Sequence, residues 1–142
     1  MSWDKTGRET DLLTWKDVME VNSYVYTVGS DGENFLKGLK EGKILGRKCP
    51  KCGKVYVPPR MYCEECFVEN GEYLELKEAY LETFTVVYYD SDGNRLEKPV
   101  TIGLIRFHGA SGGLLAYLDG VPEIGRKVEI ETYDIPLRVR VK

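Results

Sequence analysis

The spacing of apolar and polar residues changes part-way along the chain, and the second half is spaced like β-strands. From about residue 79 onward, apolar and polar positions mostly alternate, which is the period of a half-buried strand. Turn-forming residues divide this half into five expected strands, at residues 79–89, 99–108, 113–119, 127–133 and 137–142. In the last strand Leu137, Val139 and Val141 alternate with basic residues, so we expect these three side chains to face inward.

Five short strands with no helices among them cannot cover both faces of a flat sheet. Closure into a small barrel removes the exposed edges, and the OB-fold is the leading five-stranded arrangement. The sequence therefore predicts a mainly β protein in which residues 75–142 form a five-stranded OB-fold barrel.

A helical period precedes this strand-rich part. In DGENFLKGLKEGK, residues 31–43, Phe35 and Leu39 lie four positions apart on one helix face. Asp31 is the expected N-cap and Gly42 the expected stop. We therefore expect a short helix just before the middle third of the chain.

The residues before this helix are predicted less sharply. LLTWKDVME contains Thr14 three positions before Asp17, which is spaced like a capping box and predicts a second helix start. YVYTVG, residues 24–29, is expected to be extended, and residues 1–42 as a whole form an expected N-terminal helical arm. Four aromatic residues of the arm either cap the core or serve as anchors for a partner: Trp3, Trp15, Tyr24 and Tyr26.

All four cysteines lie in one short stretch, KCPKCGKVYVPPRMYCEEC. They form two C-x2-C pairs, Cys49 with Cys52 and Cys63 with Cys66. Such a pair places two sulfur atoms on one tight turn, and Gly53 suits the left-handed backbone of that turn. Two pairs joined by a short hairpin make a zinc ribbon, which we expect over residues 43–74.

Four thiolates predict a closed structural Zn²⁺ site, with iron in a rubredoxin-like electron carrier as the alternative. A site with four protein ligands has no open position for catalysis, so the thiols are expected to hold a shape.

Composition bears on where the protein works. The chain is 42% hydrophobic and 30% charged, as soluble proteins are, and no apolar run approaches the roughly 18 residues of a membrane span. MSWDKTGRETD lacks the apolar core of a signal peptide. We therefore expect a cytoplasmic protein without membrane contact, where reducing conditions favour a metal over disulfides.

Charge is distributed unevenly around the cysteines. Residues 37–60 carry eight lysines or arginines against one glutamate, whereas residues 61–98 carry ten acids against three bases. The basic segment is a candidate anion site, and the alternative is that both segments are solvated faces.

The order of these parts resembles a known family. The stretch FLKGLKEGKILGRKCPKCGKVYVPPRMYCEEC, followed by LETFTVV and PVTIGLIRF, is similar to the domain of unknown function 35 family, from about Tyr24 to the C-terminus. The resemblance implies a rubredoxin-like zinc ribbon with a C-terminal OB-fold and an association with acyl-CoA metabolism. It also implies a non-catalytic partner of thiolase-type enzymes, which in archaeal members bridges an acetoacetyl-CoA thiolase and a hydroxymethylglutaryl-CoA synthase. The four ribbon cysteines carry over as its metal ligands.

A CoA thioester would need cations for its phosphates beside an apolar or aromatic wall. The candidate CoA-binding or anion-binding residues are Arg47, Lys48, Lys54, Tyr56, Pro58, Arg60, Phe107 and Tyr117. For Phe107 and Tyr117, a place in the barrel core is the favoured alternative.

Two other functions compete with this one. A zinc ribbon beside an OB-fold also suits single-stranded nucleic acid, although a pI near 5.3 argues against broad phosphate tracking. Independent catalysis ranks last, because the single histidine, His108, has only Asp119 or Asp134 as imagined partners and no nucleophile motif accompanies it.

Overall fold

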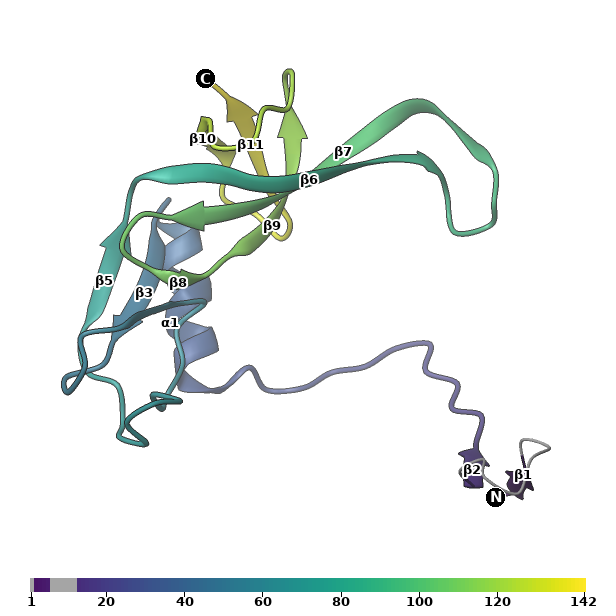
Figure 1. The fold of residues 1–142 in the computed structure, drawn as a ribbon, viewed down its shortest axis with the longest axis horizontal. Coiled ribbons are helices and arrows are strands. Elements are labelled where there is room, and N and C mark those ends of the chain that lie inside the picture. The colour runs from purple at the N-terminus through teal and green to yellow at the C-terminus, as the bar shows by residue number, and fades with distance from the viewer. Residues whose placement is uncertain (1, 6–12) are drawn as a thin grey trace.

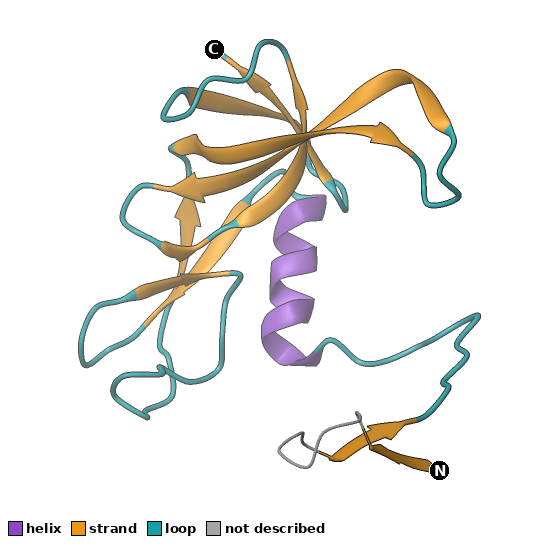
Figure 2. Cartoon of the chain, turned by 45° about the vertical axis from the view of Figure 1, so that its right-hand side comes forward, coloured by secondary structure: helices purple, strands orange, loops and turns teal. Residues whose placement is uncertain are grey.

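The computed structural model describes residues 2–5 and 13–142, which form a mainly β structure with one long helix (Figures 1 and 2). The elements in chain order are β1 (Ser2–Lys5), β2 (Leu13–Lys16), α1 (Gly29–Lys40), β3 (Ile44–Lys48), β4 (Val55–Val57), β5 (Tyr73–Leu76), β6 (Ala79–Tyr89), β7 (Arg95–Phe107), β8 (Ser111–Gly112), β9 (Leu114–Asp119), β10 (Lys127–Thr132) and β11 (Leu137–Val141). No helix in the described ranges is both long and apolar enough to cross a membrane.

Five strands close into the predicted barrel, in the order β10-β11-β9-β7-β6. The β11–β9 pair is parallel and the other four pairs are antiparallel. The strand prediction is confirmed, and β7 begins earlier than expected, at Arg95, because its hairpin with β6 continues beyond the barrel (Figure 1). Leu137 and Val139 are buried while Arg138 and Arg140 are exposed, as the alternation predicts.

The helix α1 lies against the barrel and not apart from it. Leu39 is buried in the same hydrophobic cluster as the barrel strands, and Phe35 packs against that cluster. The helix stops where the sequence predicts, since Gly42 has a φ of 71°. The N-cap prediction is wrong: Val28 occupies that position, and Asp31 lies in the first turn with its side chain directed into an ion pair.

The second predicted helix start is wrong as well. Thr14 lies in β2, which pairs with β1, and residues 17–28 have no regular structure. A short helix with no surface to bury its apolar side is marginal in water, so the capping-box spacing alone does not form one.

The remaining strands form a four-stranded sheet in the order β5-β3-β4-β8. The strand β8 belongs to the loop between barrel strands β7 and β9, and it pairs in parallel with β4 of the cysteine hairpin. The approach is close, because a Cβ atom at Gly112 would overlap the carbonyl oxygen of Val57. Ile44 and Val57 also join the barrel's hydrophobic cluster, so one core runs from the cysteine-bearing sheet into the barrel.

Candidate metal centre

Two tight turns of matching backbone hold the four cysteines. In the first, the carbonyl oxygen of Cys49 accepts a hydrogen bond from the N–H of Gly53 at 3.0 Å. In the second, the carbonyl oxygen of Cys63 accepts one from the N–H of Phe67, also at 3.0 Å. We call these turns the first knuckle, from Cys49 to Gly53, and the second knuckle, from Cys63 to Phe67.

The two knuckles end on different residues in the same backbone conformation. Gly53 has a φ of 77° and Phe67 a φ of 53°. A left-handed backbone is unstrained for glycine but costs about 1 kcal/mol or more for a residue with a Cβ atom. The Phe67 side chain is 84% exposed, so burial within this chain does not offset that strain.

The sulfur atoms have the separation that a tetrahedral metal requires. All four lie within 4.8 Å of one another, and the sulfurs of Cys52 and Cys63 are 3.7 Å apart. Sulfurs about 2.3 Å from a central zinc at tetrahedral corners are about 3.8 Å apart, whereas a disulfide measures about 2.0 Å. The four cysteines therefore fit a structural metal ion that would use all of them as ligands.

Tyr56 is buried behind the second knuckle, with 2% of its surface exposed. Its hydroxyl oxygen lies 3.3 Å from the sulfur of Cys63 and accepts a hydrogen bond from the backbone N–H of Glu64 at 3.3 Å. When Cys63 is a thiolate it can only accept, so the Tyr56 hydroxyl then donates to the sulfur. This bond lowers the pKa of the Cys63 thiol to about 6 and raises the pKa of Tyr56 to about 12. Tyr56 stabilises the thiolate form of one ligand.

Burial acts in the opposite direction on a second ligand, raising the pKa of the Cys66 thiol to about 12. Four neighbouring thiolates are therefore not stable together without a cation. A bound divalent metal supplies that charge and displaces the thiol protons.

The basic and acidic segments pair across the two knuckles. The ammonium of Lys54 donates to Glu64 at 2.7 Å and to Glu65 at 2.9 Å, and Arg60 donates to Glu64 at 3.1 Å. Both cations also lie over the Tyr56 ring, at 5.4 and 5.1 Å from its centroid. Lys54 and Arg60 thus hold the ribbon together, and little of their charge is left for an external anion.

Arg47 is also engaged within the protein. It donates to both carboxylate oxygens of Asp31, at 2.9 and 3.1 Å, and the two side chains are only 13% and 10% exposed. The hydroxyl of Tyr73 donates to the same carboxylate, and Glu69 lies 3.6 Å from the guanidinium. This buried ion pair joins the first turn of α1 to β3.

The other candidate CoA-binding residues lie apart from one another. Lys48 lines an open groove of about 560 Å³ beside the first knuckle and forms no ion pair within the described part of the chain. Pro58 is exposed, whereas Phe107 is 2% exposed within the barrel core. Tyr117 lines a separate hollow of about 380 Å³, where Arg138 lies 5.5 Å from its ring centroid. Of the eight candidates, these contacts leave Lys48, Pro58 and Tyr117 with surface free for a ligand.

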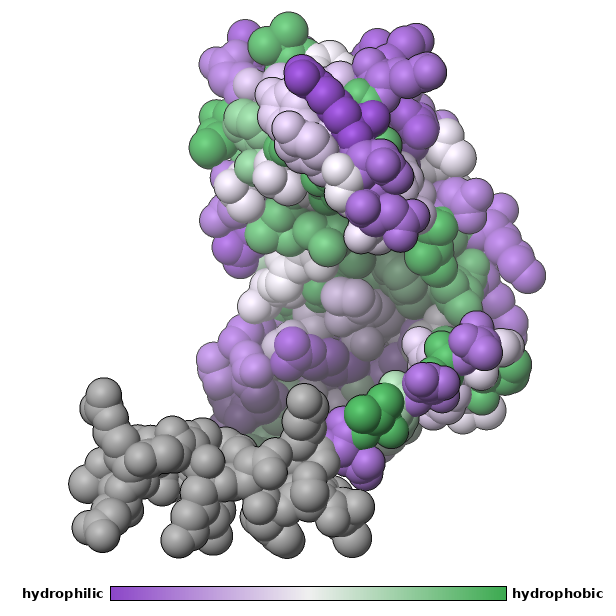
Figure 3. All heavy atoms as spheres, turned by 90° about the vertical axis from the view of Figure 1, so that its right-hand side faces the viewer, coloured by the Kyte–Doolittle hydropathy of each residue, from purple (hydrophilic) through white to green (hydrophobic). Residues whose placement is uncertain are grey.

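Apolar side chains gather on the surface in three places. The arm, residues 17–28, is exposed throughout, and Tyr24 and Tyr26 stack on each other with ring centroids 5.5 Å apart. These two tyrosines therefore do not cap the core; the side chains of Trp3 and Trp15 lie outside the described part. The second knuckle ends at the exposed Phe67, and residues of α1 and β9 line an apolar hollow of about 130 Å³. Figure 3 shows apolar side chains across the middle of one face.

Two domain families match this chain, one over the ribbon and one over the barrel. Residues 36–70 match the family described as "ChsH2, rubredoxin-like zinc ribbon domain", and residues 76–132 match "ChsH2, C-terminal OB-fold domain". The chain is also similar to a crystal structure from Sulfolobus solfataricus of a DUF35 family protein with unknown function. The two share 48% sequence identity with a TM-score of 0.75, over 80% of this chain and 87% of that one. The chain belongs to the DUF35 family.

A second solved structure resembles this DUF35 chain in fold alone. It is described as "Ltp2-ChsH2(DUF35) aldolase", and it shares 18% identity with a TM-score of 0.62, over 82% of this chain and 98% of that one. No curated protein sequence gives a significant match.

The roles of two residues at the metal centre were not predicted from the sequence. Tyr56 was predicted to face a ligand, and nothing in its local pattern indicates a bond to a cysteine seven positions away. Phe67 was detectable, because it follows the second C-x2-C pair as Gly53 follows the first. Equivalent positions in two knuckles predict equivalent backbone, and a bulky residue there marks a strained position.

Proposed function

We propose that this DUF35 chain is a non-catalytic, zinc-stabilised subunit that binds a thiolase-type acyl-CoA enzyme. The observation that carries the proposal is the arm. Between residues 17 and 28 no side chain is buried, yet seven large apolar residues are exposed: Val18, Met19, Val21, Tyr24, Val25, Tyr26 and Val28. Exposed apolar surface of this density is a mark of protein–protein contact, because it is unfavourable in water and gains most from burial by a partner.

The relatives support an association with an enzyme. The name "Ltp2-ChsH2(DUF35) aldolase" joins a DUF35 protein to a second component in an enzyme. By family resemblance the partner here is a thiolase-type enzyme, and a chain with more than one apolar surface suits a bridge between an acetoacetyl-CoA thiolase and a hydroxymethylglutaryl-CoA synthase. In this proposal residues 1–42 are the N-terminal part, which contains the partner-binding arm at residues 17–28, and residues 43–74 are the zinc ribbon and 75–142 the barrel.

The proposed metal is Zn²⁺, held by Cys49, Cys52, Cys63 and Cys66, with iron as the competing occupant. Metal binding and folding of such a ribbon are one equilibrium. Replacing Cys49 by Ser is therefore expected to abolish stoichiometric zinc, measured by plasma emission spectrometry, and to lower the melting temperature. A C49S variant that keeps full zinc and full stability would show that the ligand assignment is wrong.

The CoA-binding role keeps Lys48, Pro58 and Tyr117 as proposed contacts. Lys48 supplies a cation that forms no ion pair with any residue the structure describes, and Pro58 and Tyr117 supply apolar and aromatic surface. The remaining candidates, Arg47, Lys54, Tyr56, Arg60 and Phe107, are proposed to act on CoA only through the structure that they stabilise.

The test is capture of partners from native lysate on the tagged full chain, with and without nuclease, followed by mass spectrometry. We expect a thiolase-type enzyme to be retained, and a variant with Tyr24→Ser and Tyr26→Ser to lose it. The matched control replaces Tyr88 and Tyr89 by Ser, since these tyrosines are also exposed but lie on the β6–β7 hairpin.

Two results would overturn the proposal. One is equal retention of the enzyme by the arm variant and the control, which would place the contact elsewhere. The other is capture of ribosomal or polymerase components that disappear on nuclease treatment, which would favour the single-stranded nucleic-acid function.

A further inference from the structure

The seam that closes the barrel carries two adjoining hollows. Strands β10 and β6 meet there through two residue pairs, Lys127 with Tyr80 and Val128 with Ala79. Two hollows, of about 290 Å³ and about 190 Å³, adjoin at this pair of strands, since Ala79 and Lys127 line both. Together they reach the size of small-molecule sites, which begins at about 300 Å³.

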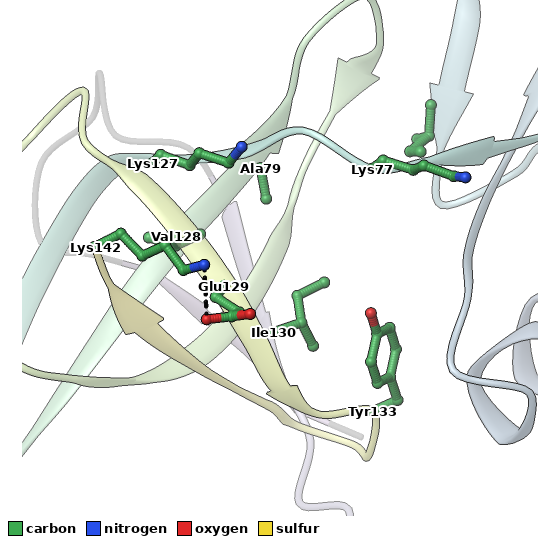
Figure 4. A pocket seen from close by; sticks show the side chains of 9 residues that line it. Lys77, Ala79, Lys127, Val128, Glu129, Ile130, Tyr133 and Lys142 are labelled. Atoms are coloured by element: carbon green, nitrogen blue, oxygen red, sulfur yellow. Dashed lines mark ion pairs between the residues drawn. The ribbon is translucent and has the colours of Figure 1, made fainter.

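The larger hollow is cationic with an apolar floor (Figure 4). Lys127 and Lys142 lie side by side on one wall, because the backbone N–H of Lys142 donates to the carbonyl oxygen of Lys127 at 3.0 Å. Lys142 is paired with Glu129 at 3.0 Å, whereas Lys127 has no ion-pair partner among the described residues. The Tyr133 hydroxyl points into the same hollow. Lys127 is therefore the cation available to an anion here.

The smaller hollow is aromatic. The rings of Tyr80 and His108 pack at a centroid distance of 4.7 Å with an interplanar angle of 30°, and His108 is exposed. The position of His108 is fixed by its backbone N–H, which donates to the carbonyl oxygen of Glu78 at 3.1 Å. An exposed, positioned ring beside a free cation offers a stacking surface for a flat heterocycle.

We propose that the barrel seam binds a phosphate-bearing purine nucleotide, with its phosphate at Lys127 and its base against His108 and Tyr80. The larger hollow holds the cation and the smaller one holds the rings, and Lys127 lines both. This arrangement matches a ligand whose charged and aromatic ends are a few bonds apart. The proposal deepens the proposed function and rests on it, since the nucleotide end of CoA has this chemistry. It places that end on the barrel, away from the ribbon cation Lys48.

The test is isothermal titration calorimetry of the full zinc-loaded chain with adenosine 3′,5′-bisphosphate, pyrophosphate and adenosine as separate probes. We expect the bisphosphate to bind and Lys127→Gln to weaken it roughly tenfold, as loss of one charged hydrogen bond does. His108→Ala is expected to weaken the bisphosphate while leaving pyrophosphate unchanged. Lys98→Gln is the matched control and should bind like the wild type, because Lys98 is exposed on β7 and lines neither hollow. Lys48→Gln tests the competing cation beside the ribbon.

The outcomes separate this inference from the proposed function. Bisphosphate binding that falls in Lys48→Gln and not in Lys127→Gln would overturn the seam site and place the nucleotide at the ribbon. No binding of the bisphosphate at millimolar concentration would also overturn it. In either case capture of the partner enzyme through the arm is measured independently and decides the proposed function by itself.

Discussion

Removing the hydroxyl of Tyr56 tests whether the polypeptide tunes its own metal ligand. In Tyr56→Phe the ring keeps its buried place, but the sulfur of Cys63 loses a donor 3.3 Å away and the N–H of Glu64 loses its acceptor. A hydrogen bond to a charged group contributes about 1.5–3 kcal/mol. Each 1.4 kcal/mol is a factor of ten, so zinc affinity should fall about 10- to 100-fold, the range that outer-shell partners of metal ligands show.

The assay is competition for zinc against a chromophoric chelator at neutral pH. Tyr62→Phe is the control, because Tyr62 is 59% exposed and its hydroxyl makes no hydrogen bond within the described part of the chain. A Tyr56→Phe variant whose zinc dissociation constant matches that of Tyr62→Phe would refute the reasoning. The hydroxyl would then fill space without stabilising the thiolate.

Four further substitutions separate the effects of backbone strain, burial and charge. Phe67→Gly should raise the free energy of unfolding by about 1 kcal/mol in denaturant titrations. Gly53→Ala should lower it by a similar amount. A loss of stability in Phe67→Gly would mean that packing of the Phe67 ring stabilises the folded state. Asp31→Ala leaves the partly buried Arg47 with Glu69, 3.6 Å away, as its remaining acidic partner. It should therefore cost about 1.5–3 kcal/mol, the contribution of hydrogen bonds to a charged group, and urea unfolding within about 1 kcal/mol of wild type would contradict this. The pKa of Glu64 is lowered by its hydrogen bond to a lysine. The contribution of Glu64 to the free energy of unfolding is therefore fully present above its unfolded-state pKa, and it is lost as the pH falls through the lower pKa of the folded state. Glu64→Gln should therefore reduce the dependence of the melting temperature on pH below about 4.5.

The strand pattern was readable from the sequence because each barrel strand has one inner and one outer face. Residues 79–89 were predicted with the bounds that β6 has, and Leu137 and Val139 face the core as their alternation requires. Alternation of apolar and polar residues indicates which side chains are buried, because inner and outer side chains alternate along each strand of a closed barrel. The cysteine spacing was equally informative, since two residues between ligands leave few backbone conformations.

The internal partners of the basic residues could not be predicted from the sequence, because they come from parts of the chain distant in sequence. Arg47 is counted as a free cation in a linear segment, yet in three dimensions it faces Asp31 from the preceding helix. Lys54 meets two glutamates from the second knuckle in the same way. A run of like charges in the sequence predicts a free charged surface only when oppositely charged residues from elsewhere in the chain do not pair with it.

The pairing of β8 with β4 sets a fixed geometry between the two ends of the molecule. Gly112 sits so close to Val57 that neither strand can move aside without losing the contact, and a shared core continues beneath both. The cysteine ribbon and the barrel therefore belong to one folded unit with a continuous core. An enzyme bound to this chain would meet the metal centre and the barrel as one body.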